Sequence, residues 1–128
     1  MLGSRLAPAR PRPQFAKRTA LTRAKKGGFR DTSSDTLLHQ FLTTSFPLTG
    51  IPASAVQDII AGVCHTPSPA YEVRAAALAA GFPETTPVEA VNRLCSSGLM
   101  ALRHVSDSIA RGELEVGLAV GYESMSSQ

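Results

Sequence analysis

The sequence predicts an α/β fold in which helices cover a parallel-rich β-sheet. Segments with apolar residues at steps of three and four alternate with short apolar runs. Two of these runs, 59–64 and 116–120, are apolar throughout, as in strands that are buried on both faces. This alternation of helix and strand indicates parallel strands joined by helical crossovers.

The first half of the expected fold contains a helix, a strand and a second helix. Ser33 or Ser34 is a suitable N-cap for the first helix, and the segment 47–52, with a proline at each end, closes it. The strand is the run 59–64. The second helix spans 71–80, after a loop marked by two prolines, and ends at Gly81. The expected buried face of the first helix consists of Leu37, Leu38, Phe41 and Leu42, and the loop prolines are Pro67 and Pro69.

The second half repeats this order. The segment 86–91 has alternating apolar side chains and a proline only near its start, which suits a short strand. A helix follows from Ser97, Gly112 ends it, and 116–120 is the next buried strand. The expected apolar face of this helix consists of Leu99, Leu102, Val105 and Ile109.

Composition places the chain among soluble globular proteins. Of its 128 residues, 43% are hydrophobic and 18% are charged. No apolar run approaches the roughly 20 residues of a membrane-spanning helix. The two cysteines, Cys64 and Cys95, are too few for a disulfide framework and indicate reduced thiols in an intracellular compartment.

Charge is distributed unevenly along the chain. Residues 1–30 hold nine basic and no acidic side chains, whereas residues 31–128 hold four basic and ten acidic ones. We interpret residues 1–17, with three prolines, as a basic leader or targeting segment rather than part of a core. Nucleic-acid binding is the competing interpretation. The segment does not favour it, because it contains a single aromatic residue, Phe15, and has no fold to organise its charges.

Cys95 is the candidate catalytic residue, because it lies between a predicted strand and the start of a predicted helix. Unpaired N–H groups and the helix dipole favour negative charge at that position, and hence a thiolate. The small residues 96–98 leave room for a substrate carbonyl, whose oxyanion the free N–H groups would hold. The alternative is that Cys95 is a buried small hydrophobic residue.

Five sequence blocks resemble those of the thiolases, in the form found in peroxisomal-type 3-ketoacyl-CoA thiolases (acetyl-CoA acyltransferases). Residues 91–99, Val-Asn-Arg-Leu-Cys-Ser-Ser-Gly-Leu, resemble the nucleophile motif of that family. The other blocks are Arg18-Thr19-Ala20, the Gly-Gly-Phe loop at 26–32, the approach to the nucleophile strand at 79–88, and the segment 117–126, which ends in Glu123-Ser124-Met125-Ser126. The resemblance covers residues 18–128, which we therefore expect to be a partial thiolase N-terminal domain.

The resemblance implies a thiolase-like fold and an acyltransferase that cleaves 3-ketoacyl-CoA to acetyl-CoA in fatty acid β-oxidation. Cys95 would be the nucleophile and form an acyl-thioester. Coenzyme A would be a co-substrate. We expect no bound cofactor and no metal, and the sequence assigns no cofactor-binding residues. The family implies a homodimer and a peroxisomal location, with the mitochondrion as the alternative. Arg5-Leu6 begins like the N-terminal peroxisomal signal, but Arg12-Pro13 departs from it.

The sequence also departs from the family. Leu94 and Met100 replace the usual Gln, and the apolar strand that precedes Arg-Thr is replaced by the proline-containing segment 11–17, which is unsuited to a central strand. The Asn-Glu-Ala-Phe, Gly-His-Pro and Cys-x-Gly segments do not occur. We therefore expect an N-terminal fragment that is inactive alone. The alternatives are a catalytically silent thiolase-like protein and a ketoacyl-synthase-type condensing enzyme, which shares a cysteine at a strand–helix turn.

The remaining polar candidates are weaker. His39 and His104 fall on polar helix faces and are expected to be exposed, while His65, next to a strand end, is the one candidate for a substitute base. Cys64 is expected to be a core residue rather than a metal ligand. Glu123, with Ser124, is either close to the active site or part of a loop that supports the nucleophile turn.

Overall fold

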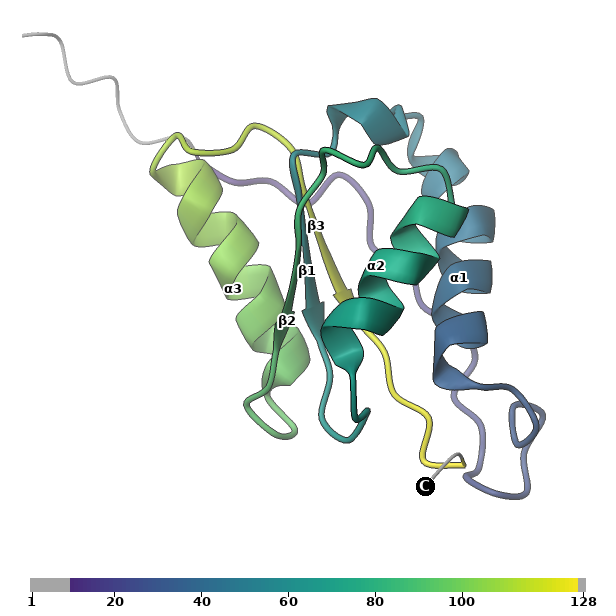
Figure 1. The fold of residues 1–128 in the computed structure, drawn as a ribbon. Helices are drawn as coiled ribbons and strands as arrows, with labels where there is room; N and C mark the ends of the chain where they lie inside the picture. The colour runs from purple at the N-terminus through teal and green to yellow at the C-terminus, as the bar shows by residue number, and fades with distance from the viewer. Residues whose placement is uncertain (1–9, 127–128) are drawn as a thin grey trace, which may run out of the picture.

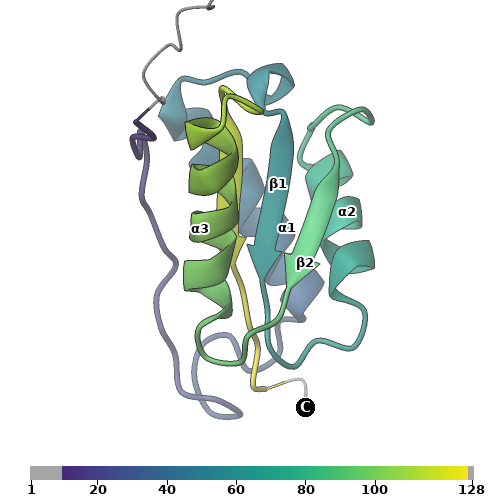
Figure 2. The same ribbon diagram turned by 90° about the vertical axis from the view of Figure 1, so that its left-hand side faces the viewer.

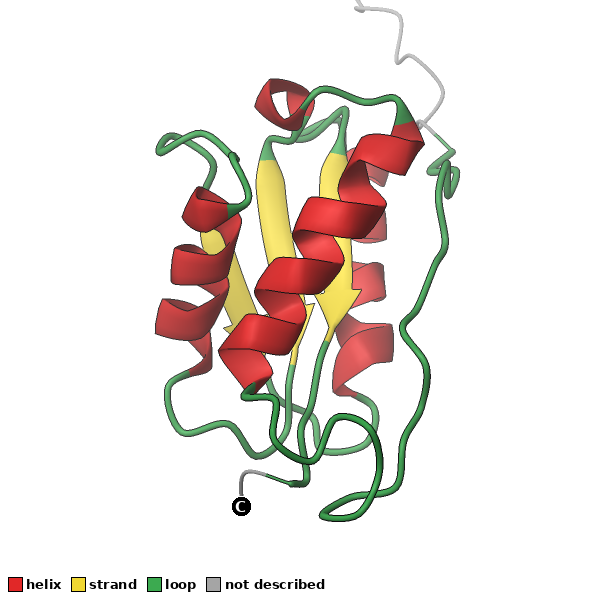
Figure 3. Ribbon diagram, turned by 90° about the vertical axis from the view of Figure 1, so that its right-hand side faces the viewer, coloured by secondary structure: helices red, strands yellow, loops and turns green. Residues whose placement is uncertain are grey.

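The computed structural model describes residues 10–126, which form three layers (Figure 1). The sheet is parallel, with strand order β2-β1-β3. Helices α1 and α2 cover one face and α3 covers the other (Figures 1 and 3). The predicted α/β class is thus confirmed. The elements are α1 Ser34–Ser45, the 3-10 helices Phe46–Thr49 and Ala53–Ala55, β1 Asp58–Gly62, α2 Pro69–Ala79, β2 Val88–Val91, α3 Ser97–Ala110 and β3 Gly117–Gly121.

Strand β1 is the centre of the sheet and of the core. Ile59 is paired with Val88 of β2 and with Leu118 of β3. Ile59 belongs to the core shared with α1 and α2, whereas the next residue, Ile60, packs with α3. Because both faces of β1 are covered, its sequence is apolar without alternation, as predicted from the run 59–64.

The larger part of the core lies between the sheet and the helices α1 and α2. Leu38, Ile59 and Val73 are almost completely buried there, each with 1% or less of its surface exposed. The rings of Phe46 and Phe82 pack beside this cluster with their centroids 4.7 Å apart. These contacts hold α1 and α2 against the sheet through apolar burial.

Helix α3 lies unusually close to the other face of the sheet. A Cβ atom added to Gly62 would overlap the backbone of Ser97, and one added to Gly117 would lie 2.7 Å from Cγ1 of Val105. The predicted apolar face of α3 is therefore partly wrong. Leu99 and Leu102 are 66% and 50% exposed. The predicted Val105 is buried and Ile109 packs against the same cluster, whereas the first two turns of α3 face the sheet with the small residues Ser97 and Ala101.

Most other predicted elements are present with shifted ends. The strands predicted at 59–64, 86–91 and 116–120 are observed at 58–62, 88–91 and 117–121. The prediction that Pro69 belongs to a loop is wrong, since it opens α2. Proline is accommodated there because its missing N–H would have no partner in the first turn of a helix.

The N-terminal segment 10–33 contains no helix or strand. The expectation that 11–17 does not form a central strand is confirmed. The segment runs along the β3 edge of the molecule, beside α3 (Figure 2). A hydrogen bond connects this segment to the C-terminal part of the chain: the N–H of Lys25 donates to Oγ of Ser126 over 2.9 Å. In the part of the chain from 10 to 126, no helix has the length and apolar character needed to cross a bilayer.

The close approach of α3 predicts that Gly62 tolerates no side chain. We expect Gly62→Ala to lower the free energy of unfolding by at least about 2 kcal/mol, because the new methyl group meets backbone that cannot rotate away. Gly28→Ala is the matched control, since no atom lies within 4 Å of its added Cβ. Urea unfolding followed by circular dichroism measures both variants, and equal midpoints would contradict this account of the contact.

Candidate active site

The turn that joins β2 to α3 is closed by side chains of its own residues. Oγ of Ser97 accepts a hydrogen bond from the N–H of Arg93 (2.8 Å) and donates one to the carbonyl oxygen of Leu94 (2.6 Å). Oδ1 of Asn92 accepts from the N–H of Leu94 over 2.9 Å. These bonds hold Leu94 in the left-handed region, with φ at +50°, which is rarely adopted by residues other than glycine.

Cys95 follows this left-handed residue and is an exposed free thiol. The alternative of a buried hydrophobic cysteine is therefore wrong. The residue lies two positions before the first residue of α3, as predicted, where the positive end of the helix dipole favours an anion. The N–H of Ser97 donates to the carbonyl oxygen of Leu94 (3.0 Å). The N–H of Met100 donates to the carbonyl oxygen of Ser96 (3.0 Å). Between them, the N–H groups of residues 98 and 99 have no acceptor within residues 10–126 and remain available as donors.

Glu123 holds the loop that follows β1. Its Oε2 accepts from the N–H groups of Cys64 (2.8 Å) and His65 (3.0 Å). Nδ2 of Asn92 donates to the carbonyl of Cys64 over 2.9 Å, which connects the same loop to the nucleophile turn. Oε1 of Glu123 is buried and has no donor within the described part of the chain, residues 10–126. Glu123 therefore supports the loop after β1 and also lines the same cleft as Cys95, and Ser124 beside it is buried.

A cleft of about 660 Å³ lies at the carboxyl ends of β1 and β3. Its walls come from the extended segment 17–21, from α1, from the ends of both strands, and from the start of α3. Cys95 lines this cleft together with Cys64, His65 and Glu123. The carboxyl ends of parallel strands are the usual position of binding sites in α/β proteins.

The structure revises three predictions about polar residues. Cys64 is only partly buried in the wall of the cleft, because β1 ends two residues before it. His39 and His104 are also partly buried rather than exposed, since both helices pack closely enough to shield positions beside their buried stripes. His65 is exposed and lines the cleft that contains Cys95. Within residues 10–126, no three His, Cys, Asp or Glu side chains are placed to hold a metal ion.

Tyr122 connects the cleft to the helices behind it. Its hydroxyl lies 3.3 Å from Oε2 of Glu72, which also accepts from Oγ of Ser34 over 2.9 Å. Burial, together with the neighbouring charge of Glu72, raises the pKa of Tyr122 well above its ordinary value. The phenol therefore stays neutral at physiological pH and acts as a hydrogen-bond donor between the sheet and α2.

Sequence reasoning did not identify the roles of Asn92, Ser97 and Gly62. Asn and Ser next to a strand–helix boundary are signals for bonds from side chain to backbone, and they were available in the sequence. The requirement for glycine at position 62 could not be inferred from the sequence, because it depends on a helix that begins 35 positions later in the chain.

Comparison with known proteins gives consistent matches. Residues 15–128 match the family described as "Thiolase, N-terminal domain". Peroxisomal 3-ketoacyl-CoA thiolase 5 of Arabidopsis thaliana is 45% identical over 114 residues, which are 88% of this chain and 25% of the relative. The peroxisomal 3-ketoacyl-CoA thiolase of Saccharomyces cerevisiae superposes with a TM-score of 0.69 at 36% identity, over 77% of this chain and 30% of the yeast chain. A further crystal structure of the yeast peroxisomal thiolase, described as dimeric, has the same TM-score and identity, over 79% of this chain and 27% of the other. The chain thus spans about a quarter of the length of these relatives.

The left-handed conformation of Leu94 predicts that this position prefers asparagine. Leu94 is 70% exposed, so its replacement removes little packing. We expect Leu94→Asn to raise the free energy of unfolding by about 0.5–1 kcal/mol, because Asn adopts positive φ more readily. Leu48→Asn is the control, since Leu48 is 72% exposed and has no positive φ. A stability gain of the same size in both variants, measured by urea unfolding, would contradict the explanation by strain.

The difference in exposure between the two thiols predicts selective alkylation. We expect iodoacetamide to modify Cys95 at least about fivefold faster than Cys64, because Cys95 is exposed beside a helix N-terminus. Peptide mass spectrometry of the native protein over time measures both rates. Cys64→Ser is the control and should leave the rate at Cys95 unchanged, whereas faster modification of Cys64 would contradict the assignment of the nucleophile.

Proposed function

The chain belongs to the thiolase family, and on this premise we propose that it carries the nucleophile of a 3-ketoacyl-CoA thiolase. The observation that carries the proposal is an exposed thiol, Cys95, at the N-terminus of α3 and inside a cleft. The names of the relatives, which are 3-ketoacyl-CoA thiolases, support the substrate class. The reaction is the thiolytic cleavage of a 3-ketoacyl-CoA into acetyl-CoA and a shortened acyl-CoA, as in fatty acid β-oxidation.

In the proposed mechanism, the thiolate of Cys95 attacks the keto carbon of the substrate. N–H groups of the first turn of α3 stabilise the resulting oxyanion. The bond between C2 and C3 then breaks, acetyl-CoA leaves as its enolate, and the acyl group stays on Cys95 as a thioester. The thiol of a second coenzyme A takes this acyl group and restores Cys95. Coenzyme A is therefore a co-substrate, and the chemistry needs no bound cofactor.

Two proton-transfer steps need groups beyond the nucleophile. A base must deprotonate the thiol and an acid must protonate the enolate. The family resemblance assigns these roles to Gly-His-Pro and Cys-x-Gly segments, which residues 1–128 do not contain. His65 is the histidine in the cleft, but its role as a substitute base has no support beyond this position. We therefore propose that the 128-residue chain alone does not turn over.

Location and assembly follow the relatives. We propose a peroxisomal enzyme that acts as a homodimer, because the relatives are named peroxisomal and one yeast structure is described as dimeric. Residues 1–17 remain our proposed leader. Its first nine residues lie outside the described part of the chain.

The proposal is tested by trapping the acyl-enzyme. The transcript is first sequenced to establish whether its reading frame continues past Gln128 into a Gly-His-Pro motif. The encoded protein is then incubated with an acyl-CoA and digested. We expect the acyl group on Cys95, and we expect Cys95→Ser to lower kcat/KM for thiolysis at least about a thousandfold because the covalent route is lost.

Cys64→Ser is the matched control for this experiment and should keep both the adduct and the activity. An adduct on any other side chain would contradict the assignment of Cys95. Turnover of acetoacetyl-CoA by the 128-residue chain alone would show that the chain supplies its own acid and base.

A further inference from the structure

Asn92 uses both ends of its side chain at the carboxyl edge of the sheet. Its Oδ1 accepts from the N–H of Leu94 over 2.9 Å, and its Nδ2 donates to the carbonyl oxygen of Cys64 over 2.9 Å. The first bond lies within the nucleophile turn, and the second crosses to the loop after β1. Strands β1 and β2 are parallel neighbours, so both segments leave the same edge of the sheet (Figure 2). Asn92 therefore ties the nucleophile turn to a point outside it.

That point of attachment is itself held in place. The N–H groups of Cys64 and His65 both donate to Oε2 of Glu123, over 2.8 and 3.0 Å. Glu123 follows β3. On the other side, the N–H of Val63 donates to the carbonyl oxygen of Val91 at the end of β2, over 3.1 Å. The loop after β1 is thus bonded to both neighbouring strand ends, and a bond to its carbonyl oxygen fixes the nucleophile turn relative to the sheet.

The bond from Leu94 to Asn92 acts on a residue in an unfavourable conformation. Leu94 has φ at +50°, where a residue with a Cβ is strained. In the described part of the chain, residues 10–126, Oδ1 of Asn92 is the acceptor for the Leu94 N–H. Asn side chains commonly bind the backbone two residues ahead in this way. Loss of the bond lets Leu94 return to negative φ, and the peptide that leads to Cys95 turns with it.

We propose that Asn92 is a positioning residue for the nucleophile, an inference that rests on the proposed function. Asn92 acts through the backbone of Leu94 and does not touch the substrate. Its two bonds keep Cys95 at the N-terminus of α3, where N–H groups are available to stabilise an oxyanion. Asparagine suits this role because one short side chain supplies an acceptor to the turn and a donor to the neighbouring loop.

The test measures the rate at which iodoacetamide alkylates Cys95 in the 128-residue protein that carries Cys64→Ser, so that a single thiol reacts. Cys95 is already exposed, so loosening of the turn adds little access. The rate therefore reports the position of the thiol relative to α3. We expect Asn92→Ala to lower the rate at least about threefold, because a thiolate that leaves the helix N-terminus loses the stabilisation found there.

A rescue separates positioning from a general loss of stability. Adding Leu94→Asn to Asn92→Ala should restore at least about half of the lost rate, because asparagine adopts positive φ without the missing bond. Asn92→Ser should react at a rate between those of the wild type and Asn92→Ala, because a serine hydroxyl makes the same bond more weakly. Circular dichroism and urea unfolding establish that each variant is folded.

Gln57→Ala is the matched control. Oε1 of Gln57 accepts from the N–H groups of Glu115 and Val116, over 2.6 and 3.1 Å, at the opposite edge of the sheet. Like Asn92→Ala, this substitution removes two hydrogen bonds that an amide side chain makes with the backbone. It should leave the rate at Cys95 unchanged.

Three results would overturn the inference. The first is alkylation at the wild-type rate in Asn92→Ala, or in Asn92→Ser where the alanine variant does not fold. The second is an equal fall in rate in Gln57→Ala. The third is a rate that Leu94→Asn does not restore at all.

Failure of this inference and failure of the proposed function are distinguishable. The alkylation rates need no substrate and no turnover, whereas the acyl adduct tests the chemistry. An adduct on Cys95 together with a wild-type rate in Asn92→Ala would overturn the positioning role alone. The expected alkylation rates with no adduct on Cys95 would overturn the thiolase chemistry and keep Asn92 as the residue that places an exposed thiol at the start of α3.

Discussion

The fold around the candidate nucleophile, Cys95, depends on the contact between the first turn of α3 and the end of β1. Gly62 has no side chain, and the backbone of Ser97 occupies the space where a Cβ would lie. Close packing of this kind is sensitive to a single methyl group. Because glycine at this position lets α3 approach the strand closely, the N-terminus of α3 lies at the carboxyl edge of the sheet. Cys95, two residues earlier, is thereby placed in the cleft.

The nucleophile turn combines local strain with local compensation. Leu94 adopts a left-handed conformation that is unfavourable for a branched apolar residue. The hydroxyl of Ser97 and the amide of Asn92 satisfy the backbone groups on both sides of it. The same Asn92 also contacts the loop after β1, which Glu123 holds from β3. The turn is therefore connected to both neighbouring strand ends, and its thiol faces a structured wall.

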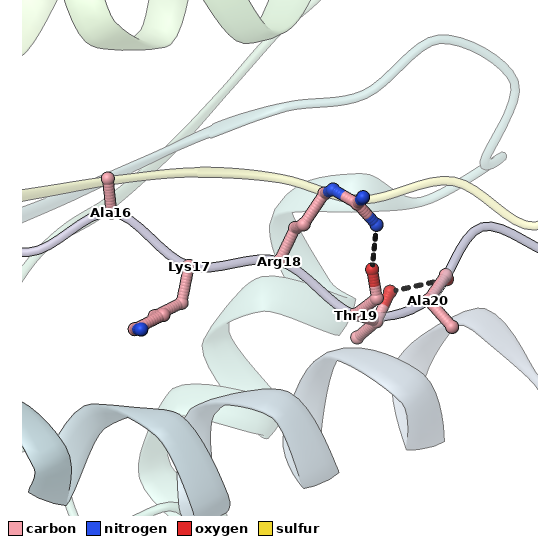
Figure 4. A pocket seen from close by; sticks show the side chains of 5 residues that line it. All are labelled: Ala16, Lys17, Arg18, Thr19 and Ala20. Atoms are coloured by element: carbon pink, nitrogen blue, oxygen red, sulfur yellow. Dashed lines mark hydrogen bonds between the residues drawn. The ribbon is translucent and has the colours of Figure 1, made fainter.

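The cleft is formed by segments that are distant in the sequence. The extended segment 17–21 lines it together with α1, the ends of β1 and β3, and the start of α3. This segment carries two of the nine basic side chains of residues 1–30, Lys17 and Arg18. Both side chains are exposed, and they point to opposite sides of the extended backbone (Figure 4). The fold thus brings an exposed thiol and part of the N-terminal segment to the same cleft.

The sequence alone determined the order of helices and strands, the parallel sheet and the position of Cys95 at a strand–helix turn. These features follow from local periodicity and from the burial of both faces of a central strand such as β1. It placed Val105 and Ile109 correctly on the buried face of α3 but not Leu99 and Leu102, which are exposed because the first two turns of α3 approach the sheet with Ser97 and Ala101. The tertiary structure alone decided which groups meet Cys95. Contacts such as Glu123 with Cys64, 59 positions apart, arise from the packing of strands side by side, and local pattern contains no information on such distances.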